Sequence, residues 1–94
     1  MFLFKSDRKN GADFSGQKVL CVGGSLSAED ICLNCWKNGA TYSHVSTRRS
    51  GGFGYVDWPP NVEERKSIVE IKENSVIFED DTEIQYDAII KVRF

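Results

Sequence analysis

The 94-residue sequence predicts an α/β fold in which a small parallel sheet is followed by an antiparallel β-meander. A mostly apolar run, a glycine turn, an amphipathic segment and a second β-rich run follow one another between residues 17 and 47, which is the order of a βαβ unit. Short apolar runs separated by polar turns fill residues 68–92, as is typical of a meander. Because such crossovers are right-handed, we expect the first two strands to be parallel.

The βαβ unit is assigned from hydrophobic spacing and from glycines. Residues 17–22 form a short, mostly apolar run between glycines, typical of a strand buried on both faces of a parallel sheet. A helix is expected from about residue 27 to 38 and a second strand at residues 41–47. Gly39 is expected to end the helix in the left-handed conformation of a C′ residue. The helix has an apolar stripe at helical spacing, formed by Ala28, Ile31, Cys32 and Cys35.

The rest of the chain is divided by its turn residues. Residues 1–16 are expected to form an N-terminal arm, and residues 17–94 the folded domain. Residues 48–64 are expected to be irregular, because three glycines and a double proline disfavour regular structure. The last of the later strands is placed to return to the parallel sheet. These strands are expected at residues 68–71, 76–78, 83–86 and 88–92.

Composition and charge limit the classes of molecule that this chain is expected to bind. The net charge of −2 gives no indication of nucleic acid or an anionic membrane. No apolar run approaches the ~20 residues that span a bilayer, and the apolar start is too short for a signal peptide, so we expect a cytoplasmic protein. Residues 1–50 carry seven Lys and Arg against four Asp and Glu, whereas residues 51–94 carry five against ten. A polyanionic small ligand therefore suits the first half better.

The turn between the first strand and the helix carries the main functional signal. Residues 23–28 match the dinucleotide fingerprint G-x-G-x-x-G/A at its first and last small positions, with Ser25 in place of the middle glycine. Gly23 permits the tight turn, and Ala28 lets the helix approach the strand. Free N–H groups at the helix start would then face a pyrophosphate; the alternative is a glycine-rich turn that binds nothing. The predicted cofactor-binding residues of this Rossmann-like turn are Gly23, Gly24, Ser25, Leu26 and Ser27.

Two arginines, Arg48 and Arg49, follow the second expected strand. NAD-dependent dehydrogenases place an Asp or Glu there, about 20 residues after the glycines, to hold the ribose 2′-hydroxyl. This sequence has no acidic residue in that region. Because a guanidinium pairs well with a dianionic 2′-phosphate, Arg48 and Arg49 predict NADPH over NADH. The alternative is a pair of arginines that are simply solvated on a loop.

Cysteine and histidine are assigned structural roles. Zinc at Cys32 and Cys35 would need further ligands, and only Cys21 and His44 remain, both on expected strands. A thioredoxin-type pair would lie at a helix N-terminus rather than in mid-helix. We therefore expect buried, reduced cysteines, and an odd number of them argues against a secreted disulfide framework. His44 has no acid or nucleophile partner recognisable in the sequence.

The roles of two other groups of side chains are inferred from the residues next to them in the sequence. Phe53, Tyr55 and Trp58 lie among glycines, where they would either line a ligand groove or pack a loop onto the core. The acidic residues 79–81 are interpreted as a solvated turn. The serines of the glycine motif lack a general base, so a hydrolase triad has no support.

The sequence from residue 14 to residue 90 resembles the NADPH-binding segment of flavin-containing monooxygenases, especially the branch that includes bacterial trimethylamine monooxygenases. The most specific part of the likeness is Ser25-x-Ser27-Ala28-Glu29-Asp30. The matching positions are residues 14–20, 22–31, 39–40, Arg48, residues 54–55, 58–59 and 86–90.

The resemblance implies an enzyme that binds FAD in one Rossmann domain and NADPH in a second, inserted one. Members of this family reduce the flavin, form a C4a-hydroperoxide with oxygen and oxygenate nucleophilic nitrogen or sulfur. By this likeness residues 23–27 would contact the pyrophosphate and ribose of NADP, and Arg48 the 2′-phosphate.

The sequence also departs from the family pattern. No FAD fingerprint or upstream histidine motif is recognisable, and residues 91–94 stand where the family continues into a C-T-G-Y or A-T-G-Y stretch. We therefore expect the NADPH-binding module of an N- or S-oxygenating monooxygenase, as a fragment, truncated gene product or degenerate paralogue. Such a chain would have no FAD site, would be inactive alone and would have an FAD-bearing domain or chain as a candidate partner. The alternatives are a non-catalytic dinucleotide-binding or interaction protein of this fold, and a chain that does not fold stably alone.

Overall fold

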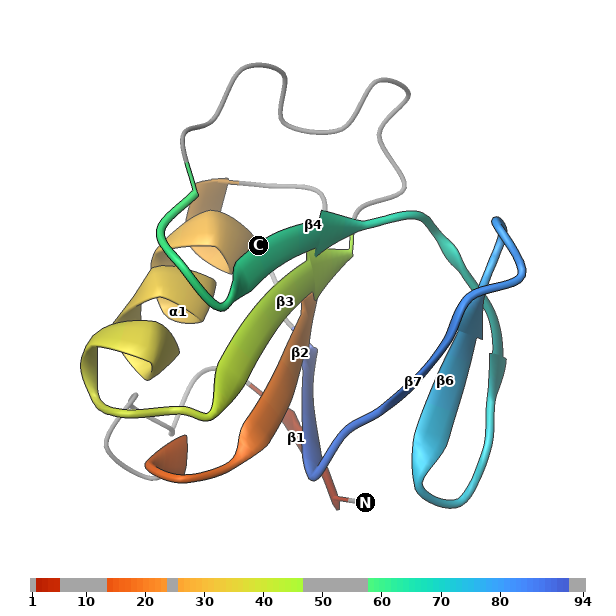
Figure 1. Cartoon of the computed structure of the whole chain (residues 1–94), viewed down its shortest axis with the longest axis horizontal. Coiled ribbons are helices and arrows are strands. Elements are labelled where there is room, and N and C mark those ends of the chain that lie inside the picture. The colour runs from red at the N-terminus through yellow and green to blue at the C-terminus, as the bar shows by residue number, and fades with distance from the viewer. Residues whose placement is uncertain (1, 6–13, 24–25, 47–57, 92–94) are drawn as a thin grey trace.

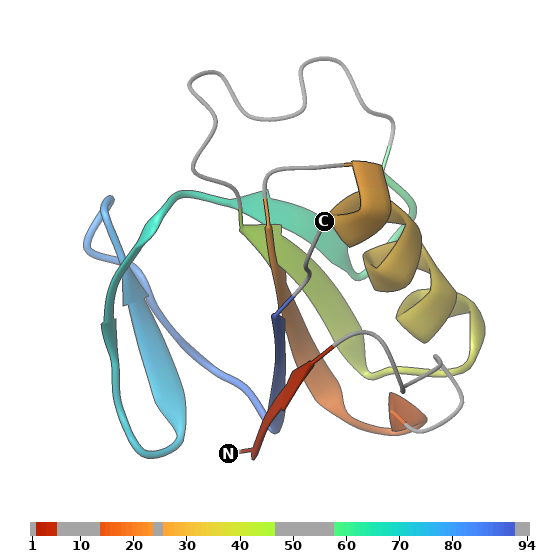
Figure 2. The same ribbon diagram turned by 180° about the vertical axis from the view of Figure 1, so that it is seen from behind.

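A computed structural model of the chain describes residues 2–5, 14–23, 26–46 and 58–91 (Figure 1). Within these ranges, five parallel strands form one sheet in the order β1-β8-β2-β3-β4, and three antiparallel strands form a second sheet in the order β5-β6-β7. Helix α1 covers one face of the parallel sheet, and the three-stranded sheet lies on the other side (Figures 1 and 2). The predicted fold class, a Rossmann-like parallel sheet with an antiparallel meander, is confirmed. The strands are β1 Phe2–Lys5, β2 Lys18–Val22, β3 Tyr42–Ser46, β4 Val62–Arg65, β5 Ile68–Ile71, β6 Ser75–Phe78, β7 Glu83–Gln85 and β8 Ala88–Lys91, and α1 is Leu26–Lys37.

The βαβ unit forms where its hydrophobic pattern predicts it. Strands β2 and β3 are parallel, and β8 returns beside β2, as expected. Helix α1 begins one residue before the predicted start and ends one residue before the predicted end. Gly39 follows it with φ of 95°, and this confirms the left-handed residue that ends the helix.

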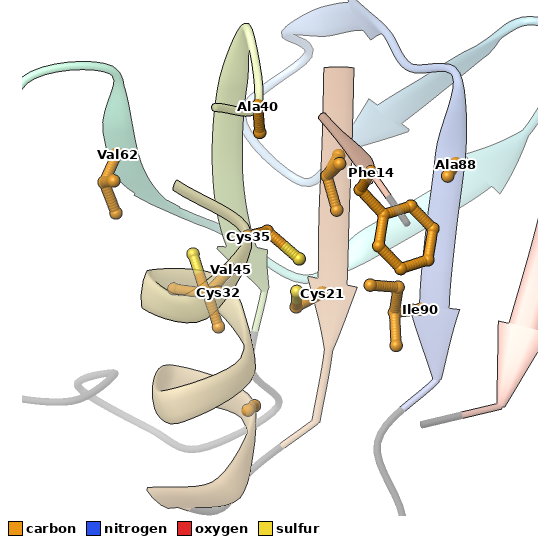
Figure 3. Packing of buried hydrophobic residues seen from close by; sticks show 11 residues of the cluster. Phe14, Cys21, Cys32, Cys35, Ala40, Val45, Val62, Ala88 and Ile90 are labelled. Carbon is orange, nitrogen blue, oxygen red and sulfur yellow. The ribbon is translucent and has the colours of Figure 1, made fainter. Parts of the chain in front are cut away.

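Helix α1 packs through small and sulfur-containing side chains. Ala28, Cys32 and Cys35 are fully buried where α1 packs on strands β2, β3 and β4. Figure 3 shows Cys32 and Cys35 in this packing. Because these side chains are short, the helix axis lies close to the sheet. The buried members of this cluster, called here the helix-side core, are Phe14, Val19, Cys21, Ala28, Cys32, Cys35, Ala40, Val45, Val62, Ala88 and Ile90.

The opposite face of the parallel sheet carries larger rings. Leu20 and Ile89 of the sheet meet Val76 and Phe78 of β6, and Tyr86 completes this group, called here the meander-side core. The solvated turn predicted at residues 79–81 is confirmed, since all three side chains are exposed. In that turn Asp81 has φ of 66°, and the Asp80 carboxylate accepts a hydrogen bond from the Thr82 N–H at 3.2 Å.

The N-terminal arm and the irregular segment need correction. Phe2–Lys5 form β1, an edge strand parallel to β8, and Phe14 is buried in the helix-side core, so parts of residues 1–16 belong to the fold. Val62–Arg65 form β4, parallel to β3, within the segment expected to be irregular. Both edge strands are only four residues long, and their partners are distant in the sequence. Tertiary pairing of this kind overrides local β-propensity.

Candidate functional site

The turn after β2 is the strand-to-helix bend that the glycine motif predicts. Gly23 follows the last residue of β2, and α1 begins at Leu26. The Gly23 N–H donates to the Ser46 carbonyl at 3.0 Å, which fixes the bend beside the end of β3. Ala28 is fully buried, as expected for the position where helix and strand approach each other.

The amino end of α1 therefore lies at the carboxyl edge of the parallel sheet. The first four N–H groups of any α-helix lack intrahelical partners, and the helix dipole makes this end positive. Ligands of open α/β sheets bind at this edge. Gly24 and Ser25, and the side chains of Leu26 and Ser27, lie outside the described residues, so their contacts stay a prediction.

The neighbouring strands end at the same edge in register. Val22 of β2 pairs with Ser46 of β3, and Ser46 pairs with Arg65 of β4. The buried Ser46 hydroxyl donates to the Lys66 carbonyl at 2.8 Å, so the ends of β3 and β4 are tied together. Arg48 follows Ser46 by two residues; Arg48 and Arg49 lie outside the described residues, and their role in binding also stays a prediction.

Sequence reasoning missed a polar cluster on the meander side of β3. No acid partner of His44 is recognisable in the sequence, but in the structure the Glu63 carboxylate lies 3.8 Å from its Nε2. The Tyr86 hydroxyl lies 2.7 Å from His44 Nδ1. Glu63 also forms an ion pair with Arg65, two residues further along β4. The β3–β4 register brings residues 44 and 63 together, and no spacing in the sequence signals it.

Burial controls the protonation of this cluster. Desolvation, with a further contribution from the Arg65 charge, lowers the pKa of His44 to about 4, while Glu63 opposes the shift. Desolvation also raises the pKa of Tyr86. At neutral pH the histidine is therefore uncharged and the tyrosine keeps its proton. Such a pair joins two elements through a hydrogen bond without placing a charge between them.

The cysteines match their predicted structural role. Cys21, Cys32 and Cys35 are free thiols, fully buried in the helix-side core (Figure 3). Hydrogen bonding to Cys32 and Cys35, followed by burial, raises the pKa of the Cys21 thiol. Among the described residues, no group of three or more His, Cys, Asp and Glu side chains could hold a metal ion. Trp58 packs against the helix-side core, whereas Phe53 and Tyr55 lie outside the described residues.

Within the described ranges, no helix combines the length and the apolar character that crossing a bilayer requires.

Comparison with known proteins points to one group of enzymes, although no family model matches the chain. The chain is 40% identical over 84 residues to a trimethylamine monooxygenase of Roseovarius nubinhibens, a match that covers 89% of this chain and 18% of that protein. A crystal structure of Tmm from a Pelagibacter species superposes with a TM-score of 0.87 at 31% identity, covering 96% of this chain and 20% of that one.

A second solved structure extends the likeness in fold. S-allyl-L-cysteine S-oxygenase from Allium sativum has a TM-score of 0.79 at 23% identity, and the match covers 96% of this chain and 21% of that one. At this identity the likeness concerns the fold alone. The chain thus spans about a fifth of the length of each of these proteins.

Proposed function

This chain is a homologue of one segment of the trimethylamine monooxygenases, which are flavin-containing monooxygenases, and from that premise we propose that it is the NADPH-binding module of such an enzyme. The observation that carries the proposal is the bend at Gly23, which lies between β2 and the amino end of α1. Backbone N–H groups at such a bend suit the pyrophosphate of a dinucleotide. Gly23, Gly24, Ser25, Leu26 and Ser27 would supply these contacts.

Selection of NADPH over NADH is assigned to Arg48, with Arg49 beside it. Ser46, the last residue of β3, accepts a hydrogen bond from Gly23 and precedes Arg48 by two residues. Arg48 therefore follows closely in sequence on the strand end that is bonded to the glycine turn. A guanidinium there would pair with the 2′-phosphate that distinguishes the two cofactors.

The module by itself holds only part of such an enzyme. Bound NADPH would supply a hydride for a flavin held by an FAD-bearing domain or chain, and oxygenation of a nucleophilic nitrogen or sulfur would follow there. We expect no turnover from these 94 residues alone, since no flavin site was recognised in their sequence. We also expect a cytoplasmic location.

A second candidate function is a non-catalytic dinucleotide-binding or interaction protein. What favours it is that the bend at Gly23 would suit a dinucleotide whether or not a flavin takes part. Flavin absorbance separates the two: a module that works with an FAD-bearing chain should co-purify with it as a yellow complex, and a non-catalytic protein should not.

Isothermal calorimetry with NADPH and NADH tests the assignment of the cofactor. We expect tighter binding of NADPH, and we expect Arg48→Ala to remove most of this preference, a change of roughly tenfold or more in the affinity ratio. Lys37→Ala is the matched control, because it removes one positive charge at the far end of α1. Equal affinities of the native chain for both cofactors would contradict the assignment of Arg48.

A further inference from the structure

Side chains rather than a shared strand ladder join the meander, residues 68–85, to the parallel sheet. The two sheets share no strand pairing among the described residues. At the exit from the meander, the Tyr42 hydroxyl of β3 donates to the Gln85 carbonyl, and the next residue, Tyr86, bonds to His44. We propose that the His44–Tyr86 hydrogen bond is a proton-sensitive latch, which holds the meander on the parallel sheet and releases it when His44 is protonated.

The latch lies in a continuous group of rings. Tyr42 stacks on His44 with ring centroids 4.6 Å apart, and Tyr86 meets His44 edge-on at 5.5 Å. Phe78 of β6 in turn meets Tyr86 edge-on at 6.3 Å. The rings therefore connect β3, through the link before β8, to the central strand of the meander. Because protein interiors are close-packed, a displacement of Tyr86 also displaces Phe78.

Protonation conflicts with this arrangement. The latch requires the neutral tautomer with its proton on Nε2, toward Glu63, because Nδ1 then accepts a hydrogen bond from the Tyr86 hydroxyl. The imidazolium carries a hydrogen on both nitrogens, so Nδ1 becomes a donor and the Tyr86 hydrogen needs another acceptor. The new charge would also be buried, because His44 is only 6% exposed.

The surrounding charges do not remove this conflict. Glu63 on β4 attracts the imidazolium, but its carboxylate lies 3.8 Å away and is half exposed. Glu63 is also already paired with Arg65, whose charge repels the imidazolium. Within the described ranges, the other titratable groups facing His44 are Tyr42 on its own strand and Tyr86 on the link. The adjacent residue of β2 on this face, Leu20, is apolar, as is Phe78 of β6.

The pH range of the latch follows from the pKa of His44 in the closed form and in the open form. The pKa of His44 is about 4 with the latch closed and returns toward the ordinary value of about 6.5 once His44 is exposed. The open form therefore binds more protons between these values, and opening becomes more favourable as the pH falls from about 6.5 toward 4.

Amide hydrogen exchange measured by NMR on the full chain tests the latch. Between pH 7 and pH 4.5, we expect protection factors in β6 and β7, corrected for intrinsic exchange, to fall by roughly tenfold or more. Protection in β2 and β8 should change much less. If both sheets lose protection together, acid unfolds the whole domain and the latch is excluded.

Three variants identify the titrating group. His44→Gln keeps an amide that can bond to Tyr86 but cannot be protonated, so the pH response of the meander should disappear. Glu63→Gln and Arg65→Gln form a matched pair, because each changes the pKa of His44 only in the closed form. Loss of the carboxylate should let the fall in protection continue to a lower pH, and loss of the guanidinium should make it level off at a higher pH. A response that persists in His44→Gln, or that moves in neither direction in the matched pair, overturns the proposal. The matched pair decides alone if His44→Gln fails to fold.

Discussion

The two faces of the parallel sheet are packed by different chemistry. The helix side contains one large buried ring, Phe14, but α1 itself meets the sheet through alanine, valine and cysteine, and its amino end lies at the glycine turn. The meander side uses phenylalanine, tyrosine and histidine, with hydrogen bonds between rings and backbone. The small side chains set the distance between α1 and the sheet. The rings of the meander side are joined by a hydrogen bond that depends on the protonation of His44. The glycine turn is thus positioned by the face that is packed with small side chains.

The largest effect is expected on the meander side, from Phe78→Ala. Phe78 is fully buried at the centre of this face, so the substitution leaves a cavity and should cost about 3–5 kcal/mol of unfolding free energy. Urea denaturation followed by circular dichroism measures it. Val69→Ala, on the exposed side of β5, is the control and should change little. A small loss for Phe78→Ala would mean that the meander contributes little to the stability of the domain.

Ala28→Leu tests the close approach on the helix side. The position is fully buried between α1 and β2, so a larger side chain overpacks the contact and should cost about 1–3 kcal/mol in the same denaturation experiment. Lys37→Leu adds an apolar side chain to an exposed position of the same helix, where the change should stay within about 0.5 kcal/mol. Equal stability of the two variants would mean that the contact between α1 and β2 has room for a larger side chain at residue 28.

The smallest effect is expected from Tyr86→Phe, which keeps the ring and removes one hydroxyl. His44 Nδ1 then loses its partner, and the unfolding free energy at pH 7 should fall by about 1 kcal/mol. Tyr42→Phe is the comparison, because its hydroxyl bonds to a backbone carbonyl at the same junction. If Tyr86→Phe is as stable as the native chain, the hydrogen bond contributes no unfolding free energy beyond that of the ring packing.

The part of the fold built from neighbouring segments was predictable, and the part built from distant pairings was not. The helix, its glycine end and the strands at residues 42–46 and 88–91 follow from hydrophobic period and turn residues. Strands β1 and β4 were missed, because each is a four-residue edge strand whose partner is far away or on the other side of a long connection.

The same distinction between local and distant features separates the bend at Gly23 from the polar cluster around His44. The bend at Gly23 is a local feature, and the structure confirms it. The contact of His44 with Glu63 and Tyr86 depends on strand register and on the return of the chain after the meander, so local patterns carry no signal for it. The binding roles of Gly24, Ser25, Arg48 and Arg49 remain predictions, since these residues lie outside the described part of the chain.

The position of β8 has a consequence for the order of assembly. This strand lies between β1 and β2, so β1 can join the other strands of the sheet only after β8 has been synthesised. Until then one edge of β2 lacks its partner β8, and closing the loop from residue 5 to residue 88 carries the entropy of a long connection. Pairing so distant in sequence is slow, so the four-residue strand β8 sets the moment at which these five strands become one sheet.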